Sequence, residues 1–225
     1  MLEVQGVKKA FGGNPVLKGI DLSVEQGDVI AIVGPSGSGK TTFLRCLNYL
    51  EQADEGEMVF DGERFAMAHI SKKNIARIRR KTAFVFQSFN LFANKTALQN
   101  VTEGLIIGRK MPKAEAEQLG LRALEKVGLG DRTEYYPSQL SGGQQQRAAI
   151  ARALVTEPAL ILADEPTGNL DSHSGEEIMH ILDELHDRGH TLVVITHSEQ
   201  VAARAGRRLR VQDGRVYGGQ EGCIC

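Results

Sequence analysis

Residues 29–41, VIAIVGPSGSGKT, decide the fold of this chain. The first five form an uninterrupted apolar run, which is typical of a strand covered on both faces of a sheet. Gly34 follows this run directly, and two more glycines stand among the small polar residues that come next. With a helix expected over residues 41–49, the segment predicts a strand, a glycine-rich loop and a helix in immediate succession.

The loop matches the phosphate-binding pattern G-x-x-x-x-G-K-[ST] from Gly34 to Thr41. Its glycines let backbone N–H groups curl around an anion at the start of the helix. We expect Lys40 to meet the β and γ phosphates of ATP and the Thr41 hydroxyl to bind Mg²⁺. The alternative is a plain glycine turn. The nucleotide-binding residues predicted here are Ser36, Gly37, Ser38, Gly39, Lys40, Thr41 and Thr42.

Two further apolar runs, residues 160–163 and 192–195, alternate with helices predicted over residues 141–155, 174–187 and 199–205. Strands that alternate with helices predict a parallel sheet with right-handed crossovers. The expected fold class is therefore α/β, with a parallel sheet core of the P-loop NTPase type.

Three regions depart from this alternation. Residues 2–24 alternate apolar and polar positions around a turn, and residues 58–60 indicate another strand pair, so we expect an antiparallel β subdomain. Residues 96–134 carry helical spacing without strands. A hairpin is predicted at residues 209–217, with no regulatory domain beyond it. We predict one domain over residues 1–225, with a core of residues 1–86 and 156–225 and an inserted α-helical subdomain of about residues 87–155.

Two carboxylates follow the apolar run at residues 160–163. Asp164 and Glu165 lie at the expected carboxyl edge of the parallel sheet, where such folds bind ligands. We expect Asp164 to hold Mg²⁺, directly or through water, and Glu165 to be the general base for the attacking water. Adjacent strand residues point to opposite faces, so only one of the two can face the metal squarely. For Asp164 alone, the alternative is a carboxylate that caps the next helix.

Gln87 follows a strand predicted over residues 83–86, which itself comes after a basic helix predicted over residues 72–81. It is also the first residue of the helical insert. We predict that its amide contacts the metal or the attacking water and that its loop moves with the insert. An isolated Gln would carry no such meaning without this position.

Composition limits the remaining functions. The chain of 225 residues has 27 Lys and Arg against 28 Asp and Glu and only 5% aromatic residues, which argues against a nucleic-acid-binding surface. Without an 18-residue apolar run or a signal peptide pattern, we expect a soluble, cytoplasmic chain. Three cysteines make no disulfide framework at this length. We expect Cys46 to be a small buried hydrophobe and the terminal Cys223 and Cys225 to be inert.

The segment LSGGQ at residues 140–144 has the ingredients of a second anion-binding helix start. The order of GPSGSGKT at 34–41, LSGGQ at 140–144 and LILADEPT at 160–167 resembles the ATP-binding cassette (ABC) family of ATPases over nearly the whole chain. The resemblance implies a nucleotide-dependent head-to-tail homodimer, in which this signature segment closes over the γ phosphate bound by the second copy. The alternative is a simple helix start. The residues implied are Ser141, Gly142, Gly143 and Gln144.

The resemblance implies four more site residues. His197 is similar to the switch histidine that contacts the γ phosphate, although a His at a strand end is often structural. Asp171 would lie at the dimer seam and couple the two sites. Phe11 would stack on adenine, with Val16 as apolar support. The family more often has Tyr at that position, and an ordinary core aromatic is the alternative for Phe11.

Features of the subfamily point in two directions. Residues 44–51, 85–92 and 136–147 resemble the ATPases of polar amino-acid importers, whereas PTGNLD at 166–171 is more similar to the lipoprotein-release and macrolide-export group. We favour amino-acid import because more separate segments agree with it. A soluble ABC ATPase without a transport role is a third alternative, but such proteins usually carry two cassettes or a long coiled coil.

The resemblance also implies partners. Integral membrane permease subunits would hold the chain at the cytoplasmic side of the cell membrane, and an extracytoplasmic solute-binding protein would complete the transporter. Near Gln87 we predict Phe89, Leu91 and Phe92 as residues that dock a short helix of the permease. The alternative is that they pack the insert against the core.

Overall fold

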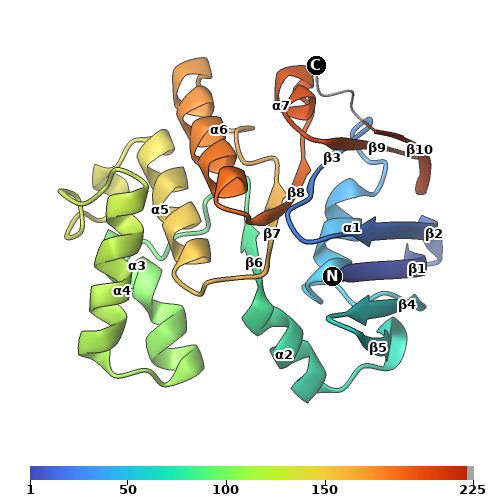
Figure 1. The fold of residues 1–225 in the computed structure, drawn as a ribbon, viewed down its shortest axis with the longest axis horizontal. Helices are drawn as coiled ribbons and strands as arrows, with labels where there is room; N and C mark the ends of the chain where they lie inside the picture. Colours follow the sequence, from blue (N-terminus) through green and yellow to red (C-terminus); the bar gives the residue numbers. More distant parts are fainter. Residues whose placement is uncertain (222–225) are drawn as a thin grey trace.

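The structure, a computed structural model, describes residues 1–221, so Cys223 and Cys225 lie outside the described residues. Within residues 1–221 the strands form two sheets (Figure 1). The strands of the antiparallel sheet, in pairing order, are β2 (Asn14–Val24), β1 (Leu2–Phe11), β4 (Glu55–Phe60) and β5 (Glu63–Ala66). The strands of the second sheet, in pairing order, are β10 (Arg215–Glu221), β9 (Arg207–Gln212), β3 (Val29–Val33), β8 (Thr191–Ile195), β7 (Leu160–Asp164) and β6 (Thr82–Val85).

The second sheet is the parallel core that the apolar runs predicted. Strands β9, β3, β8, β7 and β6 pair parallel in that order, and β10 pairs antiparallel with β9. Parallel strands need crossover connections, and here helices supply them. The predicted α/β class is confirmed.

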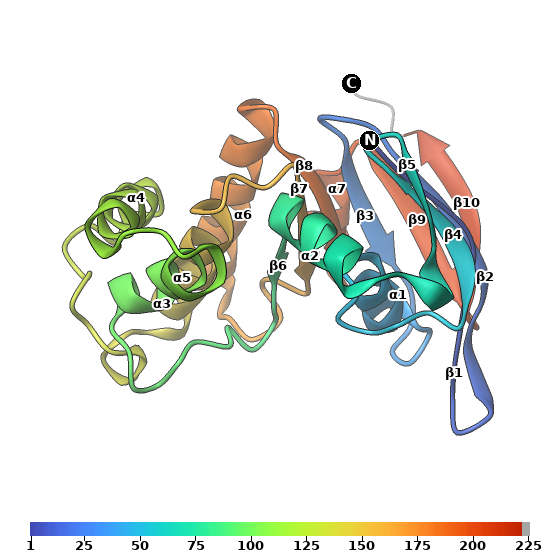
Figure 2. The same ribbon diagram turned by 90° about the horizontal axis from the view of Figure 1, so that it is seen from below.

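The helices lie on both faces of this core and at one end of it (Figures 1 and 2). In the views shown, α3, α4 and α5 gather at the end away from the antiparallel sheet. Residues 87–155 hold these three helices and, as the described structure has them, no strand. The helices are α1 (Lys40–Leu47), α2 (Lys72–Lys81), α3 (Ala97–Glu103), α4 (Lys113–Lys126), α5 (Gly142–Leu154), α6 (Ser172–Asp187) and α7 (Glu199–Ala203), with a π-helical turn η2 (Gly104–Gly108) and 3₁₀ turns η1 (Met67–His69) and η3 (Pro137–Gln139).

Strand alternation divides the core side chains between two apolar clusters. Leu160 and Leu162 of β7 pack toward α1 and the antiparallel sheet, whereas Ile161 and Ala163 pack toward α3, α4, α5 and α6. Strand β8 alternates in the same way. Each fully buried Leu or Ile stabilises the fold by about 1.5–3 kcal/mol. The sheet is therefore covered on both faces, as its unbroken apolar strands require.

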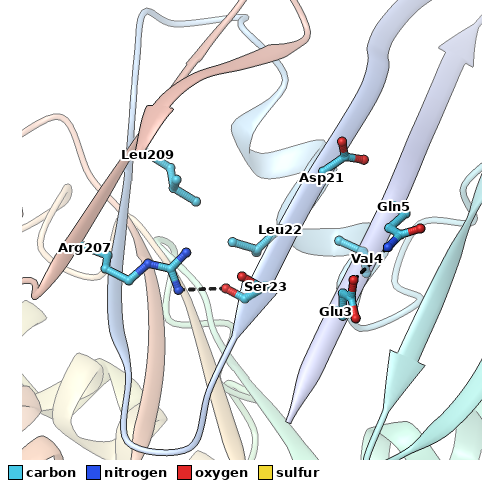
Figure 3. A pocket seen from close by; sticks show the side chains of 8 residues that line it. All are labelled: Glu3, Val4, Gln5, Asp21, Leu22, Ser23, Arg207 and Leu209. Carbon is cyan, nitrogen blue, oxygen red and sulfur yellow. Dashed lines mark hydrogen bonds between the residues drawn. The ribbon is translucent and has the colours of Figure 1, made fainter. Parts of the chain in front are cut away.

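Arg207 of β9 joins the two sheets. Its Nη1 donates hydrogen bonds to the carbonyl oxygen of Ser23 (2.9 Å) and to Asp28 Oδ2 (3.0 Å). The cleft beside it, between β9 and the edge of the antiparallel sheet, contains none of the site residues predicted from the sequence (Figure 3). Its lining residues are Glu3, Val4, Gln5, Asp21, Leu22, Ser23, Arg207 and Leu209. We regard this cleft as structural.

Most element boundaries lie within two residues of the sequence predictions, but β4 begins three residues earlier and β10 extends four residues beyond the predicted hairpin. Helix α1 ends at Leu47 instead of residue 49, because Tyr49 adopts a left-handed φ of 53° and the Arg79 side chain binds the carbonyl oxygens of Asn48 and Tyr49. Strand β6 ends at Val85, one residue earlier than predicted. No helix within residues 1–221 combines the length and the apolar character that a membrane crossing requires.

Gly120 of α4 tests the packing of α4 on α3. A Cβ there would lie 2.4 Å from Thr102 Cγ2 and 2.8 Å from Leu98 Cδ1. Alanine is about 1 kcal/mol more favourable than glycine in a helix, but overpacking costs about 1–3 kcal/mol. We expect Gly120→Ala to lower the Tm in thermal denaturation. Gly175→Ala in α6 is the matched control and should raise the Tm, because its Cβ would meet Thr167 at an ordinary 3.7 Å. A Gly120→Ala protein as stable as Gly175→Ala would contradict this packing.

Candidate active site

The phosphate loop is held tightly against two strands. Gly34 has a φ of 148°, and a Cβ there would lie 2.0 Å from the carbonyl oxygen of Val211 in β9. Gly39 has a φ of 101°, and a Cβ there would lie 3.0 Å from the carbonyl oxygen of Val16 in β2. No side chain caps α1 at Gly39. Only glycine fits at these two positions, and the first N–H groups of α1 stay available for an anion.

A pocket opens over this loop and brings together residues from distant parts of the sequence. Val16 from β2, Glu165 from the end of β7 and His197 from the end of β8 all reach it. The lining residues are Val16, Ser36, Gly37, Gly39, Lys40, Thr41, Thr42, Glu165 and His197. Phe11, Ser38, Gln87, residues 141–144, Asp164 and Asp171 do not line it. The structure thus assembles one part of the predicted site and leaves the other part outside.

Lys40 is a buried cation beneath the loop. Its Nζ donates hydrogen bonds to the carbonyl oxygens of Gly34 and Pro35, both at 2.9 Å. Burial lowers the pKa of the Lys40 ammonium, although the charges of Glu165 and Asp164 act in the opposite direction. A desolvated ammonium whose close partners are neutral carbonyls gains most from an anionic ligand. This environment fits a phosphate group at the pocket.

Thr41, which lines the pocket, and Asp164, which contacts Thr41 from the end of β7, form a pair of oxygen ligands. The Thr41 hydroxyl donates a hydrogen bond of 2.8 Å to Asp164 Oδ1. Burial raises the pKa of Asp164, against the opposing effects of that hydrogen bond and of the Arg45 charge. A cation bound here would favour the ionised carboxylate. Hydroxyl and carboxylate oxygens are the ligands that Mg²⁺ prefers, so this pair fits the metal.

Glu165 leaves the strand at a sharp turn. Its φ is 47°, and β7 ends at the preceding residue. Strand alternation does not extend to Glu165, because this residue lies beyond the end of β7 in a left-handed turn that places its side chain at the pocket, so the expectation that only one of the two carboxylates faces the metal squarely stays a prediction. Oε1 of Glu165 lies 2.6 Å from Nε2 of His197. A carboxylate on the pocket rim beside an imidazole can accept a proton from water.

Gln87 and Glu165 both reach Gly168 with their side chains. Its Nε2 donates to Asn169 Oδ1 (3.3 Å), and Asn169 Nδ2 donates to the Gln87 carbonyl oxygen (3.1 Å). A Cβ on Gly168 would lie 2.8 Å from Gln87 Nε2 and 3.3 Å from Glu165 Oε2. The amide and the carboxylate therefore converge over Gly168. This geometry supports contact with water more than contact with the metal, and the metal role of Gln87 stays a prediction.

The signature segment begins a capped helix. The Ser141 hydroxyl accepts from the Gln144 N–H (3.3 Å), and Gln144 Oε1 accepts from the Ser141 N–H (3.0 Å). Gly143 packs on α6, since a Cβ there would lie 2.9 Å from Ser174. The segment thus forms a helix start, and its role toward the nucleotide of a second copy stays a prediction. Its cap uses the hydroxyl as an acceptor, which leaves the Ser141 proton free to be donated.

Asp171 caps the neighbouring helix α6. It accepts hydrogen bonds from the N–H (3.0 Å) and the hydroxyl (2.8 Å) of Ser174, which hold the pKa of Asp171 below its usual value. The starts of α5 and α6 therefore lie side by side, because Gly143 also contacts Ser174. The role of Asp171 at a dimer seam stays a prediction.

Phe11 lies at the end of β1 and is 46% exposed, with Lys9 Nζ 5.0 Å from its ring centroid. This exposure argues against the core-aromatic alternative and leaves its face accessible for stacking. The three apolar residues after Gln87 differ from each other. Leu91 packs on the second apolar cluster, Phe89 lies against Gly142, and Phe92 is 50% exposed.

Sequence reasoning missed two side chains of α5 that reach the loop around Gln87. Gln146 binds carbonyl oxygens on both sides of the site, and Arg152 binds those of Phe89 and Asn90. A signal for Gln146 was present. It falls on the same helical face as Gly143, Ile150 and Ala153, where a polar side chain is out of place unless it has buried partners.

A phosphate loop, an acidic strand end and a separate capped signature helix on one α/β sheet define an ATP-binding cassette. The family described as ABC transporter matches residues 17–168, which is more than half of the chain. The chain belongs to the ABC transporter family, binds nucleotide and is an ATPase.

Similar proteins are known from several sources. A probable amino-acid ABC transporter ATP-binding protein of Haemophilus influenzae is 46% identical, covering 96% of this chain and 86% of that protein. The L-cystine import ATP-binding protein TcyN of Bacillus subtilis is 47% identical, covering 96% and 83%. A dimeric post-hydrolysis state of the ATP-binding cassette MJ0796, bound to ADP and Pi, has a TM-score of 0.87 and 39% identity over 98% of each chain. These proteins share the fold across the whole cassette.

Lys40→Ala should weaken ATP binding roughly 10- to 100-fold, because it deletes a charge-assisted contact worth about 1.5–3 kcal/mol. Titration with a fluorescent ATP analogue measures the change. Lys73→Ala, which removes a cation of α2 that does not line the pocket, is the control and should bind normally. Unchanged binding in Lys40→Ala would refute the assignment of the phosphate loop.

Proposed function

We propose that this chain is the ATP-hydrolysing motor subunit of a transporter that imports polar amino acids. One observation carries the motor assignment. The pocket holds the phosphate loop together with Glu165 and His197, while the signature segment lies outside it. A chain built in this way completes its site with the signature segment of a second copy.

Hydrolysis follows from the groups around the pocket. The uncapped start of α1 and the Lys40 ammonium bind the phosphates of ATP. Glu165 accepts a proton from the attacking water, and His197 holds the Glu165 side chain toward the γ phosphate. Thr41 and Asp164 would hold Mg²⁺, which neutralises phosphate charge when bound. The chain thus supplies the binding groups and the base from one copy.

The second copy would supply Ser141, Gly142, Gly143 and Gln144 in a nucleotide-dependent homodimer. Support comes from the free Ser141 hydroxyl proton and from the α5 start, which lies apart from the chain's own pocket. The similar cassette MJ0796 is dimeric in a post-hydrolysis state with ADP and Pi. Asp171, beside the signature segment, would lie at the seam between the copies, and Phe11 would stack on adenine.

Import of amino acids is favoured by the relatives of matching architecture. The amino-acid ABC transporter ATP-binding protein of Haemophilus influenzae and the L-cystine import protein TcyN match this chain over 86% and 83% of their own length. A macrolide export ATP-binding/permease protein, MacB of Shigella sonnei, is also 46% identical, but the chain spans only 34% of it. Export stays the second candidate because of this match and of the segment at residues 166–171.

We further propose that permease subunits hold the chain at the cytoplasmic face of the membrane, with an extracytoplasmic solute-binding protein in the complex. A groove of about 610 Å³ between α2 and η2 is suited to a permease segment. Arg79 and Arg109 bind backbone carbonyls at its edges, while Lys72 and Arg80 have no carboxylate partner within residues 1–221. This charge favours an acidic helix as the occupant. Its lining residues are Lys72, Ile75, Ala76, Arg79, Arg80, Gly104, Gly108, Arg109 and Thr156.

Glu165→Gln should bind ATP normally, slow hydrolysis by about a hundredfold or more, and trap an ATP-dependent dimer in solution. The physical reason is that the amide keeps the shape of the site but cannot accept the proton. Phosphate release and analytical ultracentrifugation with Mg-ATP measure the two effects. A variant that binds ATP and stays monomeric would contradict a site shared by two copies.

Arg80→Glu should abolish co-purification with co-expressed permease subunits, because it reverses the charge of a residue that lines the groove. ATP hydrolysis by the isolated chain should stay at the wild-type rate. Arg122→Glu on α4 makes the same charge change outside the groove and should leave the complex intact. If Arg80→Glu co-purifies as well as Arg122→Glu does, the permease docks elsewhere, with exposed Phe92 the next candidate.

A further inference from the structure

One buried carboxamide ties helix α5 to both sides of the hydrolytic site. Gln146 is fully buried, and its Nε2 donates to the carbonyl oxygen of Phe86 (3.3 Å) and to that of Pro166 (2.7 Å). Phe86 directly precedes Gln87, and Pro166 directly follows Glu165. The same helix begins at Ser141. A displacement of α5 would therefore move the backbone next to Gln87 and the backbone next to Glu165 together.

The chemistry of the contact fixes the orientation of the amide. Both partners are carbonyl acceptors, and only the NH₂ group of Gln146 can serve two acceptors at once. Oε1 of Gln146 is then buried without a partner among the described residues. An unpaired buried acceptor costs about 1–3 kcal/mol, but an apolar side chain at this position would take the donor away from the carbonyl oxygens of both Phe86 and Pro166. At the cost of one unpaired oxygen, the carboxamide therefore holds both carbonyls in place.

Glu165 needs such restraint, since its backbone is strained. A φ of 47° in a residue that precedes proline costs on the order of 1–3 kcal/mol and persists only where neighbours hold it. Backbone hydrogen bonds hold it on two sides, from Glu165 N–H to Ile195 (3.0 Å) and from Gly168 N–H to the Glu165 carbonyl (3.0 Å). The bond from Gln146 to Pro166 adds a side-chain restraint on the next peptide.

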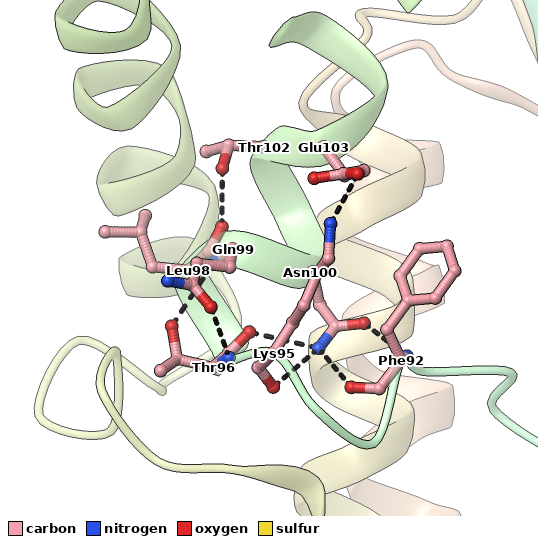
Figure 4. A network of polar contacts seen from close by, with 8 residues as sticks. All are labelled: Phe92, Lys95, Thr96, Leu98, Gln99, Asn100, Thr102 and Glu103. Atoms are coloured by element: carbon pink, nitrogen blue, oxygen red, sulfur yellow. Dashed lines mark hydrogen bonds and ion pairs between the residues drawn. The ribbon is translucent and has the colours of Figure 1, made fainter. Parts of the chain in front are cut away.

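The loop after Gln87 is restrained from the same helix. Arg152 of α5 donates to the carbonyl oxygens of Phe89 (2.8 Å) and Asn90 (2.5 Å), two residues with left-handed φ of 58° and 51°. Farther along, buried Asn100 binds the backbone of Phe92, Lys95 and Thr96 (Figure 4). Thus hydrogen bonds from α5 hold one end of the segment from Phe86 to Thr96, and hydrogen bonds from α3 hold the other end.

We propose that Gln146 is a positioning residue for ATP hydrolysis, which sets Glu165 and Gln87 from the helix that begins with the signature segment. The inference rests on the proposed function, in which Ser141 contacts nucleotide on the second copy. Closure of the dimer fixes the start of α5. Through its two hydrogen bonds, Gln146 then fixes the backbone next to the base, Glu165, and the backbone next to Gln87. Nucleotide binding at the phosphate loop does not depend on it.

Gln146→Met tests the proposal, because it keeps the volume and removes both donors. We expect kcat to fall roughly tenfold or more, the effect of losing one to two hydrogen bonds, while KM and ATP affinity stay within twofold of the wild type. Gln145→Met is the matched control on the same helix. Gln145 donates only to Leu140 of its own segment (3.1 Å), so kcat should stay at the wild-type value. Gln146→Leu supplies the same test if Gln146→Met does not fold.

The Glu165→Gln and Gln146→Met double variant separates the positioning role of Gln146 from the proposed site shared by two copies. We expect it to bind ATP and dimerise as Glu165→Gln alone does, which shows that the chain folds and closes without the Gln146 donors. Wild-type kcat in folded Gln146→Met and Gln146→Leu would overturn the positioning role, and so would a parallel loss of ATP affinity and dimerisation. Failure of Glu165→Gln itself to dimerise would instead contradict the two-copy site.

Discussion

The parallel pairing of four neighbouring strands is the constraint on which the site depends. In register, Ile32 of β3 lies beside Ile195 of β8, Ile195 beside Asp164 of β7, and Ala163 of β7 beside Val85 of β6. The four strands therefore end along one edge, where each continues into a different functional segment. A slip of one residue in any pair would turn its side chains to the opposite face and remove its segment from that edge. Apolar clusters on both faces make such a slip costly.

The same arrangement separates the start of α1 from the start of α5, the second anion-binding helix start that we propose. Helix α1 follows β3 through the phosphate loop of residues 34–39, whereas α5 belongs to the helical end of the molecule and packs on α6 through Gly143 (Figure 1). Each start is adapted differently. The start of α1 has no capping side chain, while that of α5 is capped by Ser141 and Gln144. This separation is the reason why we propose that the two starts meet only between two copies.

Much of this could be predicted from the sequence, for identifiable reasons. Strands β3, β7 and β8 are buried on both faces, so they leave unbroken apolar runs, and the residues after them are the functional ones. The glycines at 34 and 39 reflect steric limits imposed by Val211 and Val16, which again leave a pattern. Exposure of Phe11 and Phe92 could not be read, because it depends on which elements cover them. The left-handed turn at Glu165 carries no sequence mark, since no glycine occupies it.

Gln146 shows the limit of reading a sequence. Its partners are backbone carbonyls of Phe86 and Pro166, which lie 60 and 20 residues away and have no side-chain identity that a motif could record. Its neighbours in the sequence belong to the signature segment and draw attention from it. Only the helical face it shares with Ile150 indicates burial. The site combines strain at Glu165, an unpaired oxygen at Gln146 and a desolvated charge at Lys40. Each of these lowers stability by itself, and they occur together where function requires fixed positions and where the two apolar clusters supply the stability that offsets them.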